Sequence, residues 1–212
     1  RILLPNNRAV RAVTEAFVRA SGGGLLLPRL IPVGDPEIDE RVGGALEPIS
    51  SDDLPPAIDP IERLLKLASI VSAEGSSEDL RLAQDLARTL DAMLIEELAP
   101  TKLRDAVSET TDLAKHWEKS LEKLKLIYDN WPAILAEDGF FDLAERRNRL
   151  LHALANRWKD DPPDGFTVAA GSTTAAPAVA AVVGRVARMP NGMVVLLGLW
   201  LEEIMPKEEW DA

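Results

Sequence analysis

The stretch that most constrains the fold is 166–200, where two apolar runs flank a segment rich in alanine and valine. The first run, 166–170, ends at a Gly-Ser-Thr-Thr turn that also supplies N-cap residues. Residues 175–188 predict a helix with Pro177 in its first turn, and a Pro-Asn-Gly turn precedes the second run, 193–197. A strand, a helix and a strand joined by short loops predict a right-handed βαβ unit with parallel strands.

Neither apolar run alternates as a half-exposed strand does, which predicts strands covered on both faces. Ligands of parallel sheets lie at the carboxyl ends of the strands, here residues 171–174 and 198–200. A sheet that hydrolyses nucleotides needs carboxylates there to hold Mg²⁺ and position water. Neither strand end has an acid, a histidine or a lysine, and the first acids beyond are Glu202 and Glu203. Any nucleotide-binding architecture here is therefore expected to lack its catalytic groups.

Composition excludes several kinds of site. The 212 residues, 46% of them apolar, suffice for one large or two small domains. The absence of cysteine excludes disulfides, thiolate metal sites and cysteine nucleophiles, and fits a cytoplasmic protein. The two histidines, His116 and His152, lie far apart on predicted helices, where we expect surface or interface positions. No apolar run reaches about 18 residues and no signal peptide pattern is present, so we expect no membrane span.

The first third predicts a second α/β unit of the same sheet. Residues 2–4 form a short apolar run, and the Asn-Asn pair after it offers an N-cap for a helix over 8–20. A glycine-rich segment ends that helix, and residues 25–32 are a further short extended segment, in which the prolines favour an edge strand or a strand end. The chain begins with Arg1 rather than Met, and a predicted strand follows directly. We therefore interpret the chain as a piece of a longer protein.

The middle of the chain is helical and follows an acidic loop. Residues 35–59 are rich in proline, glycine and acids and have little to bury. Residues 60–159 carry helical apolar stripes. The fold class is thus predicted as α/β, with 1–34 and 160–212 forming the sheet domain and 60–159 a helical insertion that grips a partner or substrate.

One predicted helix carries a row of large apolar side chains. Core packing explains the spacing, although such a row can also stack bases. Pro132 is expected to kink or interrupt this helix. The row consists of Trp117, Leu121, Leu124, Tyr128 and Trp131.

The charge is unevenly spread along the chain. A net charge of -11 argues against a general binder of duplex DNA. Residues 1–30 nevertheless hold five arginines and one glutamate, whereas 35–59 holds eight acids and one arginine. A local nucleic-acid track along basic stretches and ordinary solvated faces both remain open. In the basic helix that follows Asp142 the leucines are expected to face inward, and four arginines to face outward: Arg146, Arg147, Arg149 and Arg157.

Two segments resemble superfamily 1 (UvrD-like) helicases. The sequence ILLPNNRA followed by a helix resembles the strand, turn and helix of motif Ia, which lies on the single-stranded DNA track of those enzymes. Residues 166–200 resemble the segment from the Asp-Glu box to the Gly-Asp-x-x-Gln box. Gly171 and Gly198 are 27 residues apart, close to the separation of those boxes.

Longer phrases resemble the amino-terminal region of the AddB family of alphaproteobacteria. They include LLLPRLIPVGD, HWEKSLEKL, RRNRLLHALANRW and VAAGSTTAAPAVAAVVGRVARMPNG, in matching order. AddB subunits join AddA in a helicase–nuclease that processes double-strand breaks for homologous recombination. The resemblance implies an inactivated helicase-like (P-loop NTPase-like) sheet with a large helical insertion, an AddA-type partner, and a nuclease domain beyond Ala212.

The family's functional residues transfer only in part. The acids of the Asp-Glu box correspond to Ala170 and Gly171, and the acid of the Gly-Asp-x-x-Gln box corresponds to Leu199, so no metal or catalytic role is carried over. Asparagine and arginine are suitable phosphate partners, so the motif Ia-like turn implies DNA backbone contacts. The residues of this turn are Asn6, Asn7 and Arg8. The alternative to DNA contact is that Asn6 or Asn7 caps the helix and that Arg8 is an exposed side chain without a function. We expect no bound cofactor.

Two other functions remain open from the sequence. Ser172 at a strand-to-helix turn is a candidate nucleophile, but its surroundings are not G-x-S-x-G and neither histidine lies near a strand end. A protein-binding helical module without DNA contact is the other alternative, with the acidic loop and the basic helix 145–159 recognising the partner.

Overall fold

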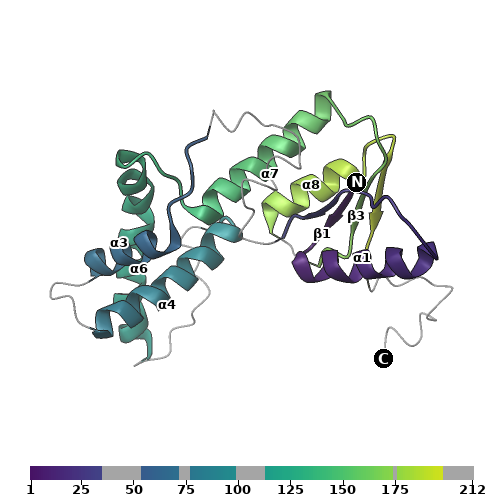
Figure 1. Ribbon diagram of the computed structural model, residues 1–212. Helices are drawn as coiled ribbons and strands as arrows, with labels where there is room; N and C mark the ends of the chain where they lie inside the picture. The colour runs from purple at the N-terminus through teal and green to yellow at the C-terminus, as the bar shows by residue number, and fades with distance from the viewer. Residues whose placement is uncertain (35–53, 72–76, 99–112, 174–175, 198–212) are drawn as a thin grey trace, which may run out of the picture.

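The computed structural model describes residues 1–34, 54–71, 77–98, 113–173 and 176–197. Within them it forms an α/β fold with a four-stranded parallel sheet and six helices (Figure 1). In chain order the elements are β1 (Ile2–Leu4), α1 (Asn7–Ser21), β2 (Leu30–Pro32), α3 (Pro60–Val71), α4 (Ser77–Ile95), α6 (Leu113–Glu137), α7 (Leu143–Asp160), β3 (Thr167–Ala170), α8 (Pro177–Val186) and β4 (Gly192–Val195).

The two ends of the chain build one sheet, in the order β2-β1-β3-β4. Ile2 of β1 pairs with Leu30 of β2 on one side and with Val168 of β3 on the other. Ala170 of β3 pairs with Val195 of β4, and every pairing is parallel. The predicted βαβ unit and the predicted edge position of β2 are therefore confirmed.

Local capping chemistry sets several helix boundaries. The side-chain oxygen of Asn6 accepts a hydrogen bond of 2.9 Å from the backbone N–H of Ala9, and α1 ends at Gly22 with φ +62°. Asp59 caps α3, since its carboxylate accepts a bond of 2.8 Å from the N–H of Ile61. These caps follow the sequence prediction.

The start of α8 differs from the prediction. Ala176 occupies the N-cap position, so no side chain caps the helix, and the predicted Ser/Thr cap is wrong. Pro177 does lie in the first turn as expected, because its ring fixes a helical φ and its missing N–H has no partner there. The helix is held instead by its apolar face, on which Val179 and Val182 are buried.

The sheet is covered unequally on its two faces. The helices α7 and α8 pack on one face, and α1 lies on the other (Figure 1). That helix contacts β1 and β2 and has no buried residue. Along β4 burial alternates, leaving Met193 47% and Val195 43% exposed. The prediction that both runs are covered on both faces is thus wrong for β4, because α8 shields only one of its faces.

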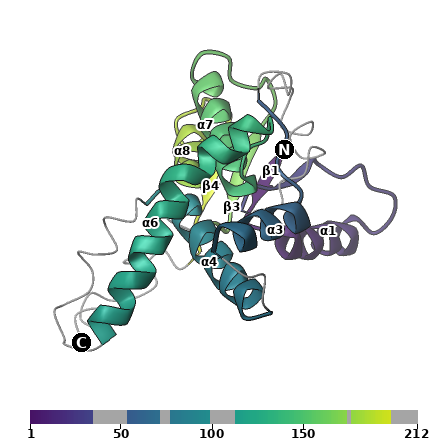
Figure 2. The same ribbon diagram turned by 90° about the vertical axis from the view of Figure 1, so that its left-hand side faces the viewer.

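A second core lies among α3, α4 and α6, beside the sheet in Figure 1. Figure 2 shows α6 running away from the sheet. Leu124, Tyr128 and Trp131 of the aromatic row pack in this core, which confirms core packing for them, while the side chains of Trp117 and Leu121 lie outside the described residues. The helix runs through Pro132 without interruption, and buried Trp131 and Leu135 anchor it on both sides.

The helix α7 connects the two cores. It packs against α4 near its start, and its later residues Leu151, Leu154 and Trp158 are buried against the sheet. Ahead of it, the backbone N–H of Phe141 donates to the carbonyl of Pro56 at 2.9 Å, fixing the end of the predicted acidic loop, of which 35–53 lies outside the described residues. Among the described helices, none is long and apolar enough to cross a membrane.

Candidate functional site

The carboxyl ends of the strands converge around Pro5. A Cβ added to Gly34, after β2, would lie 2.1 Å from the Pro5 carbonyl oxygen, so only glycine fits there. Gly171, after β3, has φ +72°, and its Cβ would lie 3.9 Å from Cδ of Pro5 and 3.8 Å from Cδ1 of Leu197. Because parallel strands end at one edge, the turns after β1, β2, β3 and β4 meet here, as predicted.

Within the motif Ia-like turn, the three predicted residues have different environments. Asn6 uses its side-chain oxygen to cap α1, which confirms the capping role. Asn7 and Arg8 lie exposed in the first turn of that helix. The DNA contact of these residues stays a prediction.

The turn after β3 holds two of the positions that the helicase resemblance aligns with catalytic acids. These two positions, Ala170 and Gly171, offer only backbone groups for polar contacts, and the N–H of Gly171 donates to the carbonyl of Val195 at 2.9 Å. Ser172 is half-buried beside them. Leu199, the third corresponding position, lies outside the described residues. The described histidine, His152, bonds to Glu97 on the helices, so the structure does not pair it with Ser172.

The strand edge has a positive electrostatic character. Both α1 and α8 begin there, and neither has an acid in its first turn. The N-terminus of each helix carries the positive end of its dipole. Arg147 adds a buried cation, since its Nη2 donates to the carbonyls of Val33 at 3.2 Å and Gly34 at 3.4 Å. Such an edge favours anions.

The prediction that the four arginines of α7 face outward is wrong for two of them. Arg146 is 6% exposed and Arg147 is 3% exposed. Each guanidinium bonds to backbone carbonyls of a distant segment, and Nε of Arg146 reaches the carbonyl of Pro55 at 3.0 Å. Because these loop carbonyls need donors, the two arginines fasten α7 to its surroundings. Of the four arginines, Arg149 and Arg157 are partly exposed.

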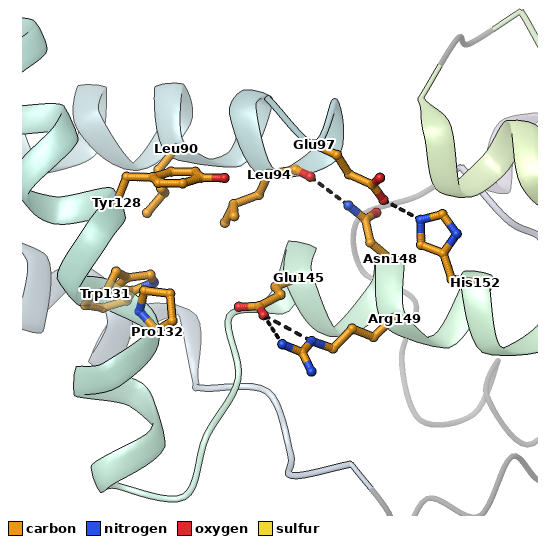
Figure 3. A pocket seen from close by; sticks show the side chains of 10 residues that line it. All are labelled: Leu90, Leu94, Glu97, Tyr128, Trp131, Pro132, Glu145, Asn148, Arg149 and His152. Carbon is orange, nitrogen blue, oxygen red and sulfur yellow. Dashed lines mark hydrogen bonds and ion pairs between the residues drawn. The ribbon is translucent and has the colours of Figure 1, made fainter. Parts of the chain in front are cut away.

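The sequence prediction missed a pocket between α4, α6 and α7 (Figure 3). Its volume is about 340 Å³. Its apolar side is lined by Leu90, Leu94, Tyr128, Trp131 and Pro132. Its polar side is lined by Glu97, Glu145, Asn148, Arg149 and His152.

Hydrogen bonds and ion pairs fix the polar side of this pocket. Nε2 of His152 and Oε1 of Glu97 are 2.5 Å apart, and Arg149 donates to Glu145 at 3.0 and 2.7 Å. Asn148, which is buried, donates to the carbonyl of Leu94 at 2.6 Å. Figure 3 shows these groups around one space.

The phenol of Tyr128 faces these acids. Burial raises the pKa of Tyr128, and the negative charges of Glu145, Asp129 and Glu97 raise this pKa further. The hydroxyl therefore stays a neutral donor and acceptor at physiological pH. It makes no hydrogen bond to the residues that the structure describes.

A sequence signal for this pocket exists in α7. Four polar residues recur on one face of a leucine-rich helix, at 145, 148, 149 and 152. Spacings of three and four place them on one side of the helix. The contribution of α4 and α6 has no comparable signal, because it depends on how the helices pack.

The described residues contain no group of three or more histidine, cysteine, aspartate or glutamate side chains able to hold a metal ion. No protein-family model matches the chain, and neither a curated protein nor a solved structure matches it.

Proposed function

We propose that the chain is the ATPase-inactive, helicase-like scaffold portion of an AddB-type double-strand break repair subunit. The observation that carries this proposal is the order of β1, β3 and β4 in one parallel sheet. This order brings the motif Ia-like turn at Asn6 beside the end of β3, where Ala170 and Gly171 replace the acids that a working ATPase needs. The helices between β2 and β3 correspond in this proposal to the helical insertion.

The scaffold role is to hold an AddA-type partner. The open face of β4 supports this role, because Met193, Val195 and Leu197 expose large apolar side chains on adjoining positions. Apolar side chains that gather on a surface favour protein contacts. In the described sheet β4 is also an outer strand, with one backbone edge unpaired.

Guiding single-stranded DNA is the second part of the proposal. Arg8 and Asn7 are exposed where α1 begins, and the N-terminus of α8 lies at the same edge of the sheet. Phosphate oxygens accept from arginine, asparagine and helix N-termini alike. No base-reading group is needed, so the contact would be independent of sequence.

Fluorescence anisotropy of a labelled single-stranded oligonucleotide at low and physiological salt tests the DNA part. We expect binding that weakens with salt, and Arg8→Ala should lower the slope of log affinity against log salt by about 1. Arg19→Ala, at the other end of α1, is the matched control, since the side chain of Arg19 is 71% exposed and pairs with Glu15. No binding at low salt would leave only the scaffold role, and Mg²⁺-dependent ATP hydrolysis by the chain would contradict the whole proposal.

Co-purification with an AddA-type subunit tests the scaffold part. Val195→Glu should abolish co-purification, because it places a charge in the proposed apolar contact. Leu82→Glu is the control, since Leu82 is 39% exposed on α4, away from the sheet. Equal recovery of the partner with both variants would exclude the face of β4 as the contact.

A protein-binding helical module without DNA contact is the alternative function. The pocket between α4, α6 and α7 favours it, because it gives the helices a concave site of their own. The burial of Arg146 and Arg147 removes two of the basic side chains on which this alternative relied. It predicts no affinity for single strands at any salt concentration.

A further inference from the structure

We propose that the pocket between α4, α6 and α7 binds a small organic cation, an amine or guanidinium group carried on an apolar or aromatic body. The lining residues come from these three helices, so the site uses none of the residues proposed to contact DNA. Success or failure of this inference is therefore separate from that of the proposed function.

Two carboxylate oxygens at the pocket are open to a donor. Both bonds from Arg149 end on Oε1 of Glu145, and His152 bonds to Oε1 of Glu97. The Oε2 atoms of Glu145 and Glu97 have no partner among the described residues. In Figure 3 the Glu145 carboxylate points toward the space beside Trp131 and Pro132. A ligand that donates hydrogen bonds can therefore bond to either of two carboxylates of the pocket.

The positive groups of the pocket are already engaged. The Arg149 guanidinium bonds to Glu145 and lies 4.5 Å from the centre of the Phe141 ring. His152 is held by Glu97. The lining carries two carboxylates and one guanidinium, and His152 is bonded to the Glu97 carboxylate. Because the open acceptors of the lining are carboxylate oxygens, the pocket attracts a cation more than an anion.

The backbone at Glu97 is an independent sign of a functional site. Within the described part of the chain, Glu97 is the one non-glycine residue with positive φ, at +52°. It ends α4 in a Schellman motif, in which its N–H donates to Leu94 at 3.1 Å and the N–H of Leu98 donates to Met93 at 2.9 Å. Glycine is the residue that suits this position. Strained backbone of this kind clusters at ligand sites, so the glutamate at this helix end supports a binding role for its side chain.

The apolar side of the pocket determines which apolar group the ligand should carry beside its charge. Leu90, Leu94 and Pro132 offer aliphatic contacts, while Tyr128 and Trp131 present aromatic rings. Aromatic rings also attract cations. The volume of about 340 Å³ fits a small ligand and lies at the lower end of the usual range for such sites.

Titration of the full chain with 2-phenylethylamine, followed by amide NMR spectra at neutral pH, tests this inference. Its counterparts are 2-phenylethanol, which is neutral, and 3-phenylpropanoate, which is anionic. We expect the amine to bind roughly fivefold or more tightly than the alcohol, and the anion to bind least. Chemical-shift changes should gather on α4, α6 and α7. Equal affinities for the amine and the alcohol, or no binding of either, would overturn the proposal.

Two variants test the role of the carboxylates while preserving the fold. Glu97→Gly removes one acceptor at a position whose backbone favours glycine, and Glu145→Gln removes the other charge. Each variant should bind the amine roughly fivefold more weakly and should bind the alcohol with unchanged affinity. Glu96→Gln, at an exposed neighbour outside the pocket, is the matched control. Unchanged amine affinity in both pocket variants would contradict the assignment even if the amine binds.

The cation that binds this pocket can come from two sources, a free aromatic amine or an arginine side chain of a partner protein. N-acetylarginine methylamide represents the second source. Tighter binding of this compound than of 2-phenylethylamine assigns the pocket to a partner's side chain, and the reverse order assigns it to a free amine.

Discussion

Trp131 donates a hydrogen bond of 2.8 Å from its indole Nε1 to Oδ2 of Asp142, a carboxylate with no exposed surface. Nε of Arg63 donates to the same oxygen at 2.8 Å, and Oδ1 of Asp142 caps α7 by accepting from Ala144 at 3.1 Å. Arg63 continues to Asp91 on α4 at 2.7 Å. One buried carboxylate thus connects α3, α6 and α7, and through Arg63 also α4.

Replacing this carboxylate should destabilise the protein strongly. Asp142→Ala leaves the guanidinium of Arg63 and the indole of Trp131 without their acceptor and removes the helix cap. We expect the free energy of unfolding to fall by about 3 kcal/mol. Urea denaturation followed by tryptophan fluorescence measures it. Asp85→Ala, at an acid that is 70% exposed, should change little, and equal effects of the two variants would refute the role of the network.

The alkaline titration of Tyr128 should occur above its ordinary range. It is the one tyrosine of the chain, so the tyrosinate absorbance reports it alone. Burial and the charges of Glu145, Asp129 and Glu97 raise its pKa from 10.0. Glu145→Gln should move the midpoint downward, while the urea-unfolded chain should titrate near the ordinary value.

The same shift predicts how stability depends on pH. Because the folded-state pKa of Tyr128 is raised, the neutral phenol contributes stability that is fully present below the unfolded value of 10.0. This contribution is lost as pH rises through the folded-state pKa. The free energy of unfolding should therefore fall less between neutral and alkaline pH in Tyr128→Phe than in the unchanged protein. A fall of the same size in both proteins would contradict the raised pKa.

Arg147 should act on stability, in contrast to a partly exposed arginine of the same helix. Arg147→Met deprives the carbonyls of Val33 and Gly34 of a donor in a buried place. We expect a loss of about 2 kcal/mol in the free energy of unfolding. Arg157→Met, at a side chain that is 37% exposed, is the control and should have little effect. Similar small effects for both would argue for an outward role of Arg147.

Two glycines should respond oppositely to alanine. Gly34→Ala places a methyl group 2.1 Å from the Pro5 carbonyl oxygen, where backbone must move, and should cost about 2 kcal/mol of stability. Gly184→Ala, inside α8, meets only the movable Nη1 of Arg188 at 3.2 Å. It should be neutral or raise stability by up to about 1 kcal/mol. Thermal unfolding of both variants checks the pair, and tolerance of alanine at Gly34 would refute the close approach.

What the sequence determined by itself is the local structure. Asn6 and Asp59 begin helices because their side-chain oxygens satisfy backbone N–H groups two or three residues away, an interaction that needs no distant partner. The two apolar runs around α8 likewise predicted the parallel pair of β3 and β4, since short connections leave few other arrangements.

Which side chains are buried depends on the packing of segments that are distant in the sequence. The arginine spacing of α7 did not predict that Arg146 and Arg147 turn inward, because their acceptors, the carbonyls of Pro55 and Val33, lie some ninety to one hundred and fourteen residues away in the chain. The pocket depends in the same way on three helices meeting. Burial is a sum over contacts between distant segments, whereas helix periodicity and capping are properties of neighbours.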